Sequence, residues 1–391
     1  MPLPLRVLFT FAGGQGHLNP MLPLASLLGE AGHQVAVAGQ DSVVENMTSF
    51  GSVFPYPSAN HVLDDQTTGV LVQPDLNHEF GVIGDYFVSR LGHTNAQRVG
   101  EIIQQWRPRL LVCDEMDFGA MVAAERFEVP LVIVNVIASG GLTRPDHVAE
   151  PLRALRESFG LGPDPRLSML EGDLVVAPFP PSFRDPSFPL PQTAVSIRSE
   201  TRNGPGDHPA VDWLRAGSEQ TRIYFTLGTV FNTESGDLCT RVLEGLQELP
   251  ARILATVGTN IDPSSIPISA ANVRIERFVP QSLVLPVVDL VVNHGGSGSV
   301  IGALAHGIPL IVIPLGADQE LNAHRVEALG AGLKLDPMTC TPLEISNGVQ
   351  CILQSGTAAD AAHRVQEEIA ALPDVSSLLP ALEKVSRVRS L

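Results

Sequence analysis

A glycine-rich turn between an apolar run and an amphipathic stretch is the feature that most constrains how this chain can fold. The turn, Asn293-His294-Gly295-Gly296-Ser297-Gly298-Ser299, follows the apolar residues 290–292 and precedes a stretch that ends at Gly307. This order predicts a strand, a tight turn and a helix, and the first backbone N–H groups of such a helix have no partner within it. The pattern therefore indicates an anion site at the edge of an α/β sheet.

The start of the chain repeats this order of elements. An apolar run at residues 6–11 is followed by three glycines and by a helical pattern with Asn19 as N-cap and Gly32 at its end, before a second strand at residues 34–38. Such a βαβ unit implies a parallel sheet with right-handed crossovers. The fold class is therefore α/β.

Alternating apolar runs and helical patterns continue along most of the chain. We expect further elements at residues 41–50, 94–106, 110–113, 119–127, 131–134, 223–227, 238–249, 252–257, 290–293, 300–306, 310–313 and 319–329, and two helices after residue 358. Residues 55–93 and 137–188 are expected to be irregular. They are too long to be plain connectors, and loops of this kind commonly shape a binding cleft.

The length of 391 residues suits two domains that each bury a core. We predict an N-terminal domain over residues 1–200, a linker over 201–218 and a second doubly wound domain over 219–370. The last segment, residues 371–391, is expected to be a helix.

Composition excludes several classes of function. Hydrophobic residues make up 44% of the chain and charged residues 17%, which is typical of a globular protein, and the net charge of −17 argues against nucleic-acid binding. No apolar run approaches the ~20 residues that span a bilayer, and no secretory signal is present, so we expect a cytoplasmic protein without integral membrane association. The four cysteines lack metal-ligand spacing and are read as thiols of a reducing compartment: Cys113, Cys239, Cys340 and Cys351.

His17 is the candidate base of the N-terminal domain. The glycines before it lack the third glycine of a dinucleotide fingerprint, and the region has no P-loop lysine. His17 instead comes directly before a helix, at the carboxyl end of the first strand, where α/β sheets hold their ligands. It can remove a proton from a bound ligand, or it can simply pack on the turn.

An acidic residue follows a second strand of the same domain. Asp114 comes directly after the run 110–113, and within hydrogen-bond reach of His17 it would fix the imidazole tautomer and stabilise the imidazolium. Glu115 and Asp117 are alternatives for this role, and Asp114 could instead cap a helix.

In the C-terminal domain the turn from His294 to Ser299 offers backbone N–H groups, an imidazole and a hydroxyl, which together can hold a diphosphate without a metal or a lysine. Each such helix-terminus contact stabilises an anion by about 0.3–1 kcal/mol, so several must act together. Gly228 and Thr229, after the strand at 223–227, would form a second wall.

Two polar residues follow the next strand of this domain. Asp318 and Gln319 could accept and donate hydrogen bonds to vicinal hydroxyl groups. Asp318 could equally be a helix N-cap.

Taken together, four motifs resemble those of the family 1 glycosyltransferases of the GT-B fold, and the resemblance is strongest to actinobacterial enzymes that glycosylate natural products. The motifs are Gly16-His17-Leu18-Asn19-Pro20, Phe278-Val279-Pro280-Gln281, the His294 turn and Asp318-Gln319. The resemblance implies two Rossmann-like doubly wound domains that face a central cleft, an acceptor-binding N-terminal domain and a nucleotide-sugar-binding C-terminal domain. The resemblance further implies that the last helix, within residues 371–391, packs back on the N-terminal domain. It also implies an inverting, metal-independent transfer from a nucleotide-activated sugar to a hydroxyl acceptor, without any cofactor besides this co-substrate.

The resemblance also assigns roles to individual residues. His17 matches the general base and Asp114 the acid that orients it. Residues matching the diphosphate cradle are His294, Gly295, Gly296, Ser297, Gly298 and Ser299, with Gly228 and Thr229 opposite. The nucleobase wall matches Phe278, Val279 and Gln281, and the donor-sugar pair matches Asp318 and Gln319.

Two departures from the plant relatives bear on the donor. Those relatives carry Trp where this chain has Phe278, and a ribose-binding Glu where it has Gly302. Loss of a partner for ribose hydroxyls favours a deoxyribose, so we expect a dTDP-sugar, and a deoxysugar in particular.

The acceptor is expected to be a small hydrophobic aglycone, held under the loops 55–93 and 137–147. Phe80, Tyr86 and Phe87 are candidate walls for it, although a core role fits them equally. Within the same fold, an epimerase or hydrolase of nucleotide sugars, or a non-catalytic nucleotide-binding partner protein, are the alternative functions. A monomer and a homodimer are both compatible with the sequence.

Overall fold

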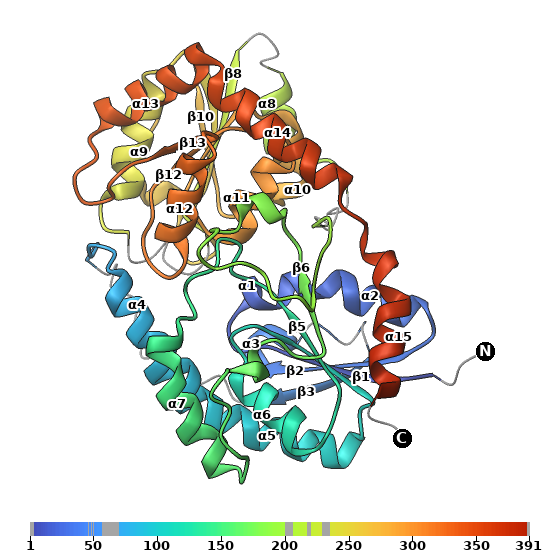
Figure 1. Cartoon of the computed structure of the whole chain (residues 1–391). Coiled ribbons are helices and arrows are strands. Elements are labelled where there is room, and N and C mark those ends of the chain that lie inside the picture. The colour runs from blue at the N-terminus through green and yellow to red at the C-terminus, as the bar shows by residue number, and fades with distance from the viewer. Residues whose placement is uncertain are drawn as a thin grey trace. The chain divides into compact units, whose positions relative to one another are not determined.

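The computed structural model describes residues 4–45, 47, 49, 51–56, 70–199, 206–216, 220–228 and 235–388, and its chain forms two compact units. Unit 1 comprises Met1–Asp64, Asn77–Glu200 and Leu372–Leu391, and unit 2 comprises Asp65–Leu76 and Thr201–Ala371. Each unit contains one parallel β-sheet with helices on both faces (Figure 1). The α/β class with two doubly wound sheets is confirmed.

Unit 1 contains a seven-stranded sheet in the order β3-β2-β1-β4-β5-β6-β7. Its strands are β1 (Arg6–Thr10), β2 (Gln34–Gln40), β3 (Ser52–Tyr56), β4 (Leu110–Asp114), β5 (Leu131–Val134), β6 (Leu174–Ala177) and β7 (Ala194–Ser196). Its helical elements are α1 (Gln15–Leu18), η1 (Asn19–Met21), α2 (Leu22–Glu30), α3 (Asp41–Val44), α4 (Leu76–Val82), the π-helix η3 (Ile83–Leu91), α5 (Gly92–Trp106), α6 (Phe118–Arg126), α7 (Pro145–Ser158), η4 (Ser168–Leu170), η5 (Pro181–Phe183), η9 (Val375–Leu378) and α15 (Leu379–Val388).

Unit 2 contains a six-stranded sheet in the order β10-β9-β8-β11-β12-β13. Its strands are β8 (Thr221–Thr226), β9 (Ala251–Thr256), β10 (Val273–Glu276), β11 (Leu290–Asn293), β12 (Leu310–Val312) and β13 (Gly332–Lys334). Its helical elements are α8 (Pro209–Arg215), α9 (Leu238–Gln247), η7 (Pro263–Ser265), α10 (Gln281–Val284), η8 (Leu285–Val287), α11 (Ser297–Leu304), α12 (Gln319–Ala328), α13 (Pro342–Ser355) and α14 (Thr357–Ala371).

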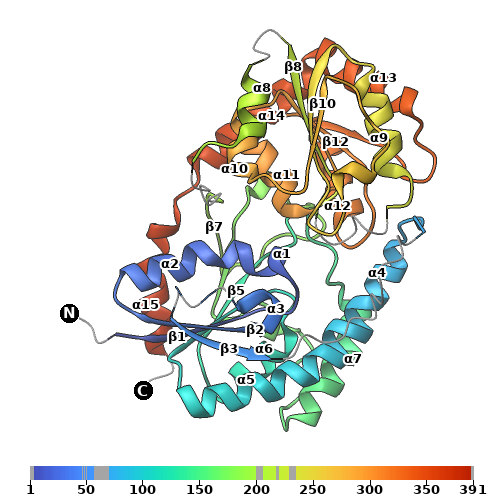
Figure 2. The same ribbon diagram turned by 180° about the vertical axis from the view of Figure 1, so that it is seen from behind.

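The core of unit 1 follows from the two-residue period of its strands. Val7 and Phe9 of β1 and their neighbours on β2, β4, β5 and β6 point to one face, where they meet the apolar side of α2. Leu378 of η9 and Leu382 of α15 are buried in the same cluster. Figure 2 shows α2 and α15 on one side of this sheet and α5 on the other side. The end of the chain is thus part of the core of unit 1.

Helices α5 and α6, on the other face, pack with their backbones almost in contact. A Cβ atom on Gly119 would lie 2.4 Å from Gly92 O and 2.6 Å from Ala96 N, so only glycine fits at this crossing. The close approach fixes where α6 begins, next to the carboxyl end of β4.

The core of unit 2 is built in the same way. Alternate residues of β8, β9, β11 and β12 pack against the buried sides of α9 and α13, as Val242 and Ile345 illustrate. Leu71, from the short segment that precedes α4, also packs against this cluster.

The start of the first helical segment differs from the sequence expectation. The helix begins at Gln15, with Gly14 as N-cap, and Asn19 lies inside a continuous run formed by α1, η1 and α2. The expectation that Asn19 caps the helix is wrong, because the turn after β1 closes two residues before His17. Gly32, with φ of 84°, follows α2 as expected.

Two regions expected to be irregular contain regular structure. Between residues 55 and 93 the chain forms α4 and a nine-residue π-helix, and between 137 and 188 it forms α7 and β6. The four-residue run of β6 is too short to give a clear period, and Pro151 inside α7 reads as a break. The helix expected at 41–50 is four residues long, α3, and residues 46, 48 and 50 lie outside the described part.

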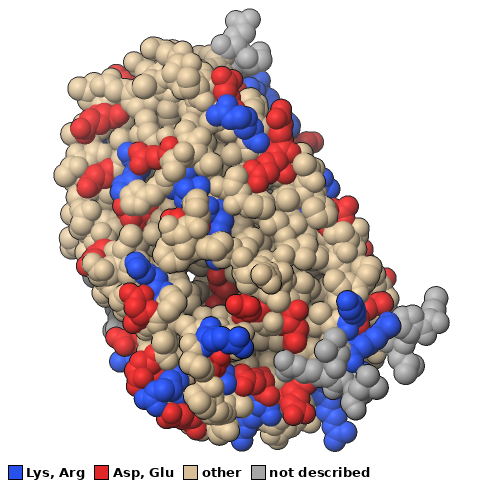
Figure 3. Space-filling view, viewed as in Figure 1, with Lys and Arg blue, Asp and Glu red and all other residues tan. Residues whose placement is uncertain are grey.

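No helix in the described ranges is long and apolar enough to cross a membrane. On the face shown in Figure 3, acidic and basic side chains of the described residues are interspersed, without the continuous basic stripe that typically binds a nucleic-acid backbone.

The buried position of Leu382 predicts that α15 stabilises unit 1. Leu382 is 0% exposed, whereas Leu343 on α13 is 67% exposed. We expect Leu382→Ala to lower the free energy of unfolding of unit 1 by about 2–5 kcal/mol and Leu343→Ala to change stability by less than about 0.5 kcal/mol. The measurement is urea unfolding followed by Trp106 fluorescence in a Trp213→Phe background, since each unit contains one tryptophan. Equal effects of the two substitutions would contradict the packing of α15 in this core.

Candidate active site

In each unit, predicted site residues lie where the strand order of the sheet changes direction. In unit 1 the strand order changes direction between β1 and β4. His17 lies in the segment that follows β1, and Asp114 is the last residue of β4. In unit 2 the strand order changes direction between β8 and β11, which Gly228 and His294 follow. Open α/β sheets bind ligands at these switch points, outside the carboxyl ends of the strands.

His17 and Asp114 form a hydrogen-bonded pair. Nδ1 of His17 lies 3.1 Å from Oδ1 of Asp114, with the imidazole 23% exposed and the carboxylate fully buried. The imidazole lies over Gly13, where a Cβ atom would come within 2.2 Å of the ring. Residue 13 must therefore be glycine for His17 to adopt this position.

The carboxylate of Asp114 is held by backbone groups as well as by the imidazole. Its Oδ2 accepts a 2.7 Å hydrogen bond from Ala12 N, and its Oδ1 accepts one of 2.7 Å from Met116 N. Such bonds offset the cost of burying a charged carboxylate. Asp114 therefore joins the turn after β1 to the turn after β4.

The two alternative acids are engaged elsewhere. Glu115 accepts hydrogen bonds from Val136 N and Ile137 N, and burial raises the pKa of its carboxyl. Asp117 is the N-cap of α6 and accepts a hydrogen bond from Ala120 N at 3.1 Å. The capping role considered for Asp114 thus belongs to Asp117.

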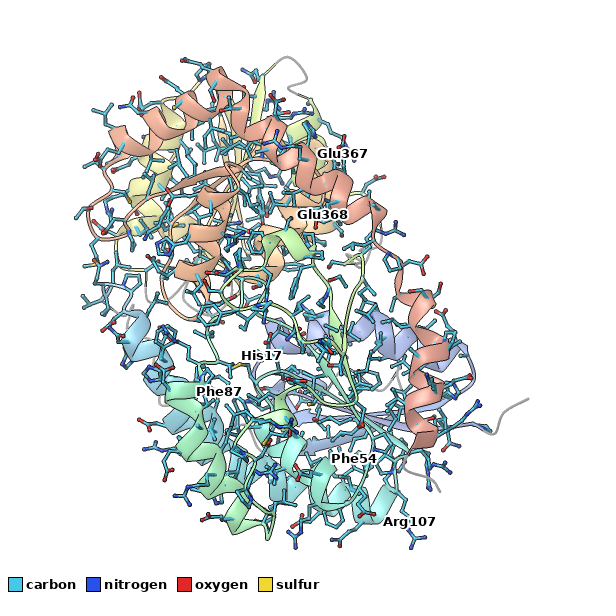
Figure 4. All side chains as sticks on the ribbon, in the orientation of Figure 1. His17, Phe54, Phe87, Arg107, Glu367 and Glu368 are labelled. Carbon is cyan, nitrogen blue, oxygen red and sulfur yellow. The ribbon has the colours of Figure 1, made fainter. Side chains whose placement is uncertain are left out.

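The three aromatic residues considered for the acceptor have different surroundings. The ring of Phe87 is stacked near that of His17, with ring centroids 6.2 Å apart and ring planes at 18° (Figure 4). Tyr86 packs edge-on against Phe87. Phe80 is buried, 5.2 Å from the His147 ring, with Arg144 over its face. The π-helix thus places an aromatic ring against the candidate base.

His294 is clamped between two glycines of unit 2. A Cβ atom on Gly296 would lie 2.6 Å from its Nε2, and one on Gly228 would lie 2.6 Å from its Cε1. Burial lowers the pKa of His294 to about 4, so the imidazole is neutral near neutral pH. A neutral imidazole can still donate one N–H to an anion.

A buried network holds the turn that follows β11. Oδ2 of Asp318 accepts hydrogen bonds from Ser297 Oγ at 2.6 Å and from Asn322 Nδ2 at 2.7 Å, and the Asn322 amide also donates to Gly295 O at 2.8 Å. Asp318 occupies the N-cap position of α12, but its side chain makes no capping hydrogen bond there. It ties the turn to α12 instead.

Sequence reasoning missed Asn322, which is fully buried in this network. Its spacing from Asp318 was the available signal, because residues four apart on a helix share a face.

The remaining predicted residues of unit 2 surround the same turn. Gln319 accepts hydrogen bonds from Leu315 N and Gly316 N through Oε1, and Gln281 Nε2 donates to Ser299 Oγ at 3.2 Å. Val279 is buried, whereas Phe278 is 61% exposed and presents its ring to solvent. Gly298 has open space around it, and Thr229 lies outside the described residues.

Gly302 is buried inside α11. A Cβ atom there would lie 3.3 Å from Leu285 Cδ1, so a larger side chain would require this leucine to move. Across the described ranges, no cluster of three or more histidine, cysteine, aspartate or glutamate side chains could hold a metal ion.

Comparison with known proteins finds the same architecture and related sequences. Residues 240–385 match the model for the C-terminal domain of erythromycin biosynthesis protein CIII-like proteins. The chain is 31% identical to the L-demethylnoviosyl transferase of Streptomyces niveus, over 94% of this chain and 95% of the relative. It is 27% identical to the aclacinomycin-T 2-deoxy-L-fucose transferase of Streptomyces galilaeus, over 98% and 96%. The structure of the glycosyltransferase VinC in complex with dTDP is similar with a TM-score of 0.77, at 25% identity, over 98% of this chain and 100% of that one.

The clamp around His294 predicts a sharp difference between two neighbouring glycines. We expect Gly296→Ala to displace the imidazole and to weaken the binding of inorganic pyrophosphate at least about ten-fold, since preorganised donors would be lost. Gly298→Ala keeps every backbone N–H and meets no neighbour, so it should bind within about two-fold of the original protein. NMR titration with pyrophosphate measures both. Equal affinities in the two variants would show that His294 does not contribute to anion binding.

Proposed function

The chain belongs to the family 1 glycosyltransferases of the GT-B fold, together with the actinobacterial antibiotic enzymes to which it is similar, and on this premise we propose its reaction. It transfers a deoxysugar, with inversion, from a dTDP-sugar to a hydroxyl of a hydrophobic natural-product aglycone. The observation that carries the proposal is the hydrogen bond from His17 to the fully buried Asp114. This pair has the geometry of a base and the acid that orients it.

The base acts through the nitrogen that faces away from Asp114. With the carboxylate of Asp114 as acceptor, the resting imidazole carries its proton on Nδ1 and leaves Nε2 as a proton acceptor. Nε2 of His17 takes the hydroxyl proton as the acceptor oxygen attacks the anomeric carbon. The bond from this carbon to the diphosphate breaks in the same displacement, which inverts the configuration. General base catalysis of this kind contributes about 10² to 10⁴ in rate.

The leaving diphosphate is assigned to the turn after β11. The first N–H groups of α11, the neutral imidazole of His294 and the hydroxyl of Ser299 supply donors, and the helix terminus favours negative charge. Gly228 and Thr229 are assigned to the opposite wall. These donors do not depend on a metal ion, so we propose a metal-independent reaction with no cofactor beyond the nucleotide sugar.

The nucleotide and the sugar are proposed from the relatives and from one position of this chain. VinC is described in complex with dTDP, and the S. galilaeus relative is named for transfer of 2-deoxy-L-fucose. Gly302 offers no side chain to a ribose hydroxyl. The exposed ring of Phe278, with Val279 and Gln281, is assigned to the nucleobase, and Asp318 and Gln319 are assigned to the sugar hydroxyls.

The acceptor is assigned to the surface of unit 1 beside the base. Phe87 stacks near His17 and Tyr86 packs on Phe87, so an apolar aglycone would meet aromatic rings close to the reacting nitrogen. Phe80 is buried against His147 and Arg144, so it is the least accessible of the three candidate walls. Both catalytic residues are present, which favours an enzyme over a non-catalytic nucleotide-binding protein.

Removing the base should abolish transfer and leave donor binding intact. We expect His17→Ala to lower kcat at least about 100-fold, and Asp114→Asn to lower it by a factor on the order of 10², with dTDP affinity unchanged within about two-fold. Transfer is followed by mass spectrometry with dTDP-deoxysugars and polyketide or macrolide aglycones. His363→Ala, which removes an exposed histidine of α14, is the matched control and should keep full activity. Retention of most activity by His17→Ala would remove His17 from the role of base.

The missing ribose partner predicts a preference for deoxyribose. Calorimetry should show dTDP binding about ten-fold more tightly than UDP, because a 2′-hydroxyl would be buried without a partner. UDP and dTDP differ in the 2′-hydroxyl and in the thymine methyl group, and dUDP lacks both. It should therefore bind nearly as well as dTDP if the 2′-hydroxyl is the cause. Tighter binding of UDP than of dTDP would contradict the proposed donor, and equal binding of UDP and dUDP would assign the preference to the thymine methyl group.

A further inference from the structure

A second buried carboxyl lies one turn away from the acid that holds the candidate base. Asp117 N donates a 3.1 Å hydrogen bond to Asp114 O, which closes a tight turn at the carboxyl end of β4. The side chain of Asp117 is buried, as is that of Asp114. Two carboxyl groups are therefore buried within one turn of each other, and one of them, that of Asp114, is hydrogen-bonded to the His17 imidazole.

The surroundings of Asp117 do not balance a negative charge. Its Oδ1 accepts hydrogen bonds from Ala120 N at 3.1 Å and from Asn95 Nδ2 at 3.0 Å, while its Oδ2 has no hydrogen-bond partner in the described part of the chain. Among the same residues, no lysine, arginine or histidine forms an ion pair with Asp117. A buried carboxyl in this state is poised between its neutral and ionised forms.

Asp117 belongs to a group of buried polar side chains that converge from four elements. Nine buried side-chain atoms in the described part of the chain lack a hydrogen-bond partner, and four of them come from β1, β3, α5 and the N-cap of α6: Thr10 Oγ1, Tyr56 OH, Asn95 Oδ1 and Asp117 Oδ2. The Asn95 amide donates to Asp117 Oδ1, which joins α5 to the N-cap of α6 within this group, and the Thr10 hydroxyl lowers the pKa of Asp117. Such atoms are rare in native proteins and call for a functional explanation.

Two further titratable groups of this region, the Cys113 thiol and the Tyr56 phenol, are uncharged near neutral pH. Burial raises the pKa of the Cys113 thiol, and the charges of Asp117 and Asp114 raise it further. Burial likewise raises the pKa of Tyr56, whose ring lies 4.7 Å from the guanidinium of Arg98. Arg98 places a positive charge over this ring, and Asp117 is the buried acid of this group whose charge changes near neutral pH.

We propose that Asp117 is a positioning residue for the base, whose negative charge adds to that of Asp114 and stabilises the imidazolium formed at His17. When Asp117 is protonated, Asp114 alone stabilises that cation. Asp117 itself touches neither substrate nor the reacting atoms. This inference rests on the proposed role of His17.

The direction of the pH effect follows from the environment. Burial, followed by the charge of Asp114, raises the pKa of Asp117 to about 6, and the hydrogen bonds from Asn95 and Ala120 N, together with the nearby Thr10 hydroxyl, oppose this rise. The charge of Asp117 is therefore present above about pH 6 and is lost as the pH falls through that value. Its contribution to transfer should be lost over the same range.

The first test removes the negative charge of Asp117 and keeps the shape of its side chain. Asp117→Asn retains an oxygen that can accept from Ala120 N, and asparagine is a good N-cap, so α6 should be preserved. We expect kcat to fall about ten-fold between pH 7 and 9, as a unit charge at short range in a protein interior is worth this much, with dTDP affinity unchanged. The pH at which kcat/KM falls to half should also move lower, because the imidazole loses a neighbouring negative charge.

A second variant changes when Asp117 ionises without removing it. Asn95→Ala deletes the amide that donates to Asp117 Oδ1, so ionisation should require a higher pH. We expect activity to be reduced near pH 7 and to return to within about two-fold of the original protein at pH 9. A purely structural effect of Asn95 would lower activity equally at both pH values.

Controls separate this inference from the proposed function. Asp173→Asn alters another carboxylate that accepts a backbone N–H, from Leu131, but at the amino end of β6, and its pH profile should not change. If His17→Ala keeps its activity, the proposed base is wrong. If His17→Ala is inactive while Asp117→Asn keeps the kcat and pH profile of the original protein, the role of Asp117 alone is overturned. A pH-independent loss in Asn95→Ala would also overturn it, even if Asp117→Asn failed to fold.

Discussion

The hydrogen bonds to the buried carboxylate of Asp114 are the interactions on which the position of the candidate base depends. A charged group can remain in the interior only if its oxygens are hydrogen-bonded, and here two backbone N–H groups and the His17 imidazole meet that need. One donor follows β1 and another follows β4, so the carboxylate fixes the two turns relative to each other. The position of the candidate base is therefore a consequence of satisfying one buried charge.

The second sheet reaches the same result by a different route. The imidazole of its turn after β11 is held by the absence of side chains at Gly228 and Gly296. Asp318 and Asn322 then tie this turn to α12 through buried hydrogen bonds. In both units, a polar network shapes a loop at a switch point, which suits the binding of a charged donor and the transfer of a sugar.

Strong local patterns allowed much of the fold to be predicted. The expected strands at 6–11, 110–113 and 290–293 correspond to β1, β4 and β11, because their apolar runs are bounded by polar or glycine-rich turns. The strands β3, β6, β7, β10 and β13 were missed, and all of these except β6 contain proline, glycine or polar residues that interrupt the apolar run. Helix α7 was missed because Pro151 lies inside it, and the π-helix because its period has no signature in a sequence. Tertiary packing stabilises all of these elements.

The sequence by itself determined the α/β class, the family and the residue types that gather at the strand ends, because these follow from local periodicity and from motifs of contiguous residues. Tertiary structure decided which of three neighbouring acids meets His17: Asp114 pairs with it, Glu115 holds the loop after β5, and Asp117 caps α6. It also decided that His294 is clamped by glycines from two different turns and that Asn322 anchors one of them. These outcomes depend on which strands lie side by side in the sheet, and that arrangement joins residues far apart in the chain.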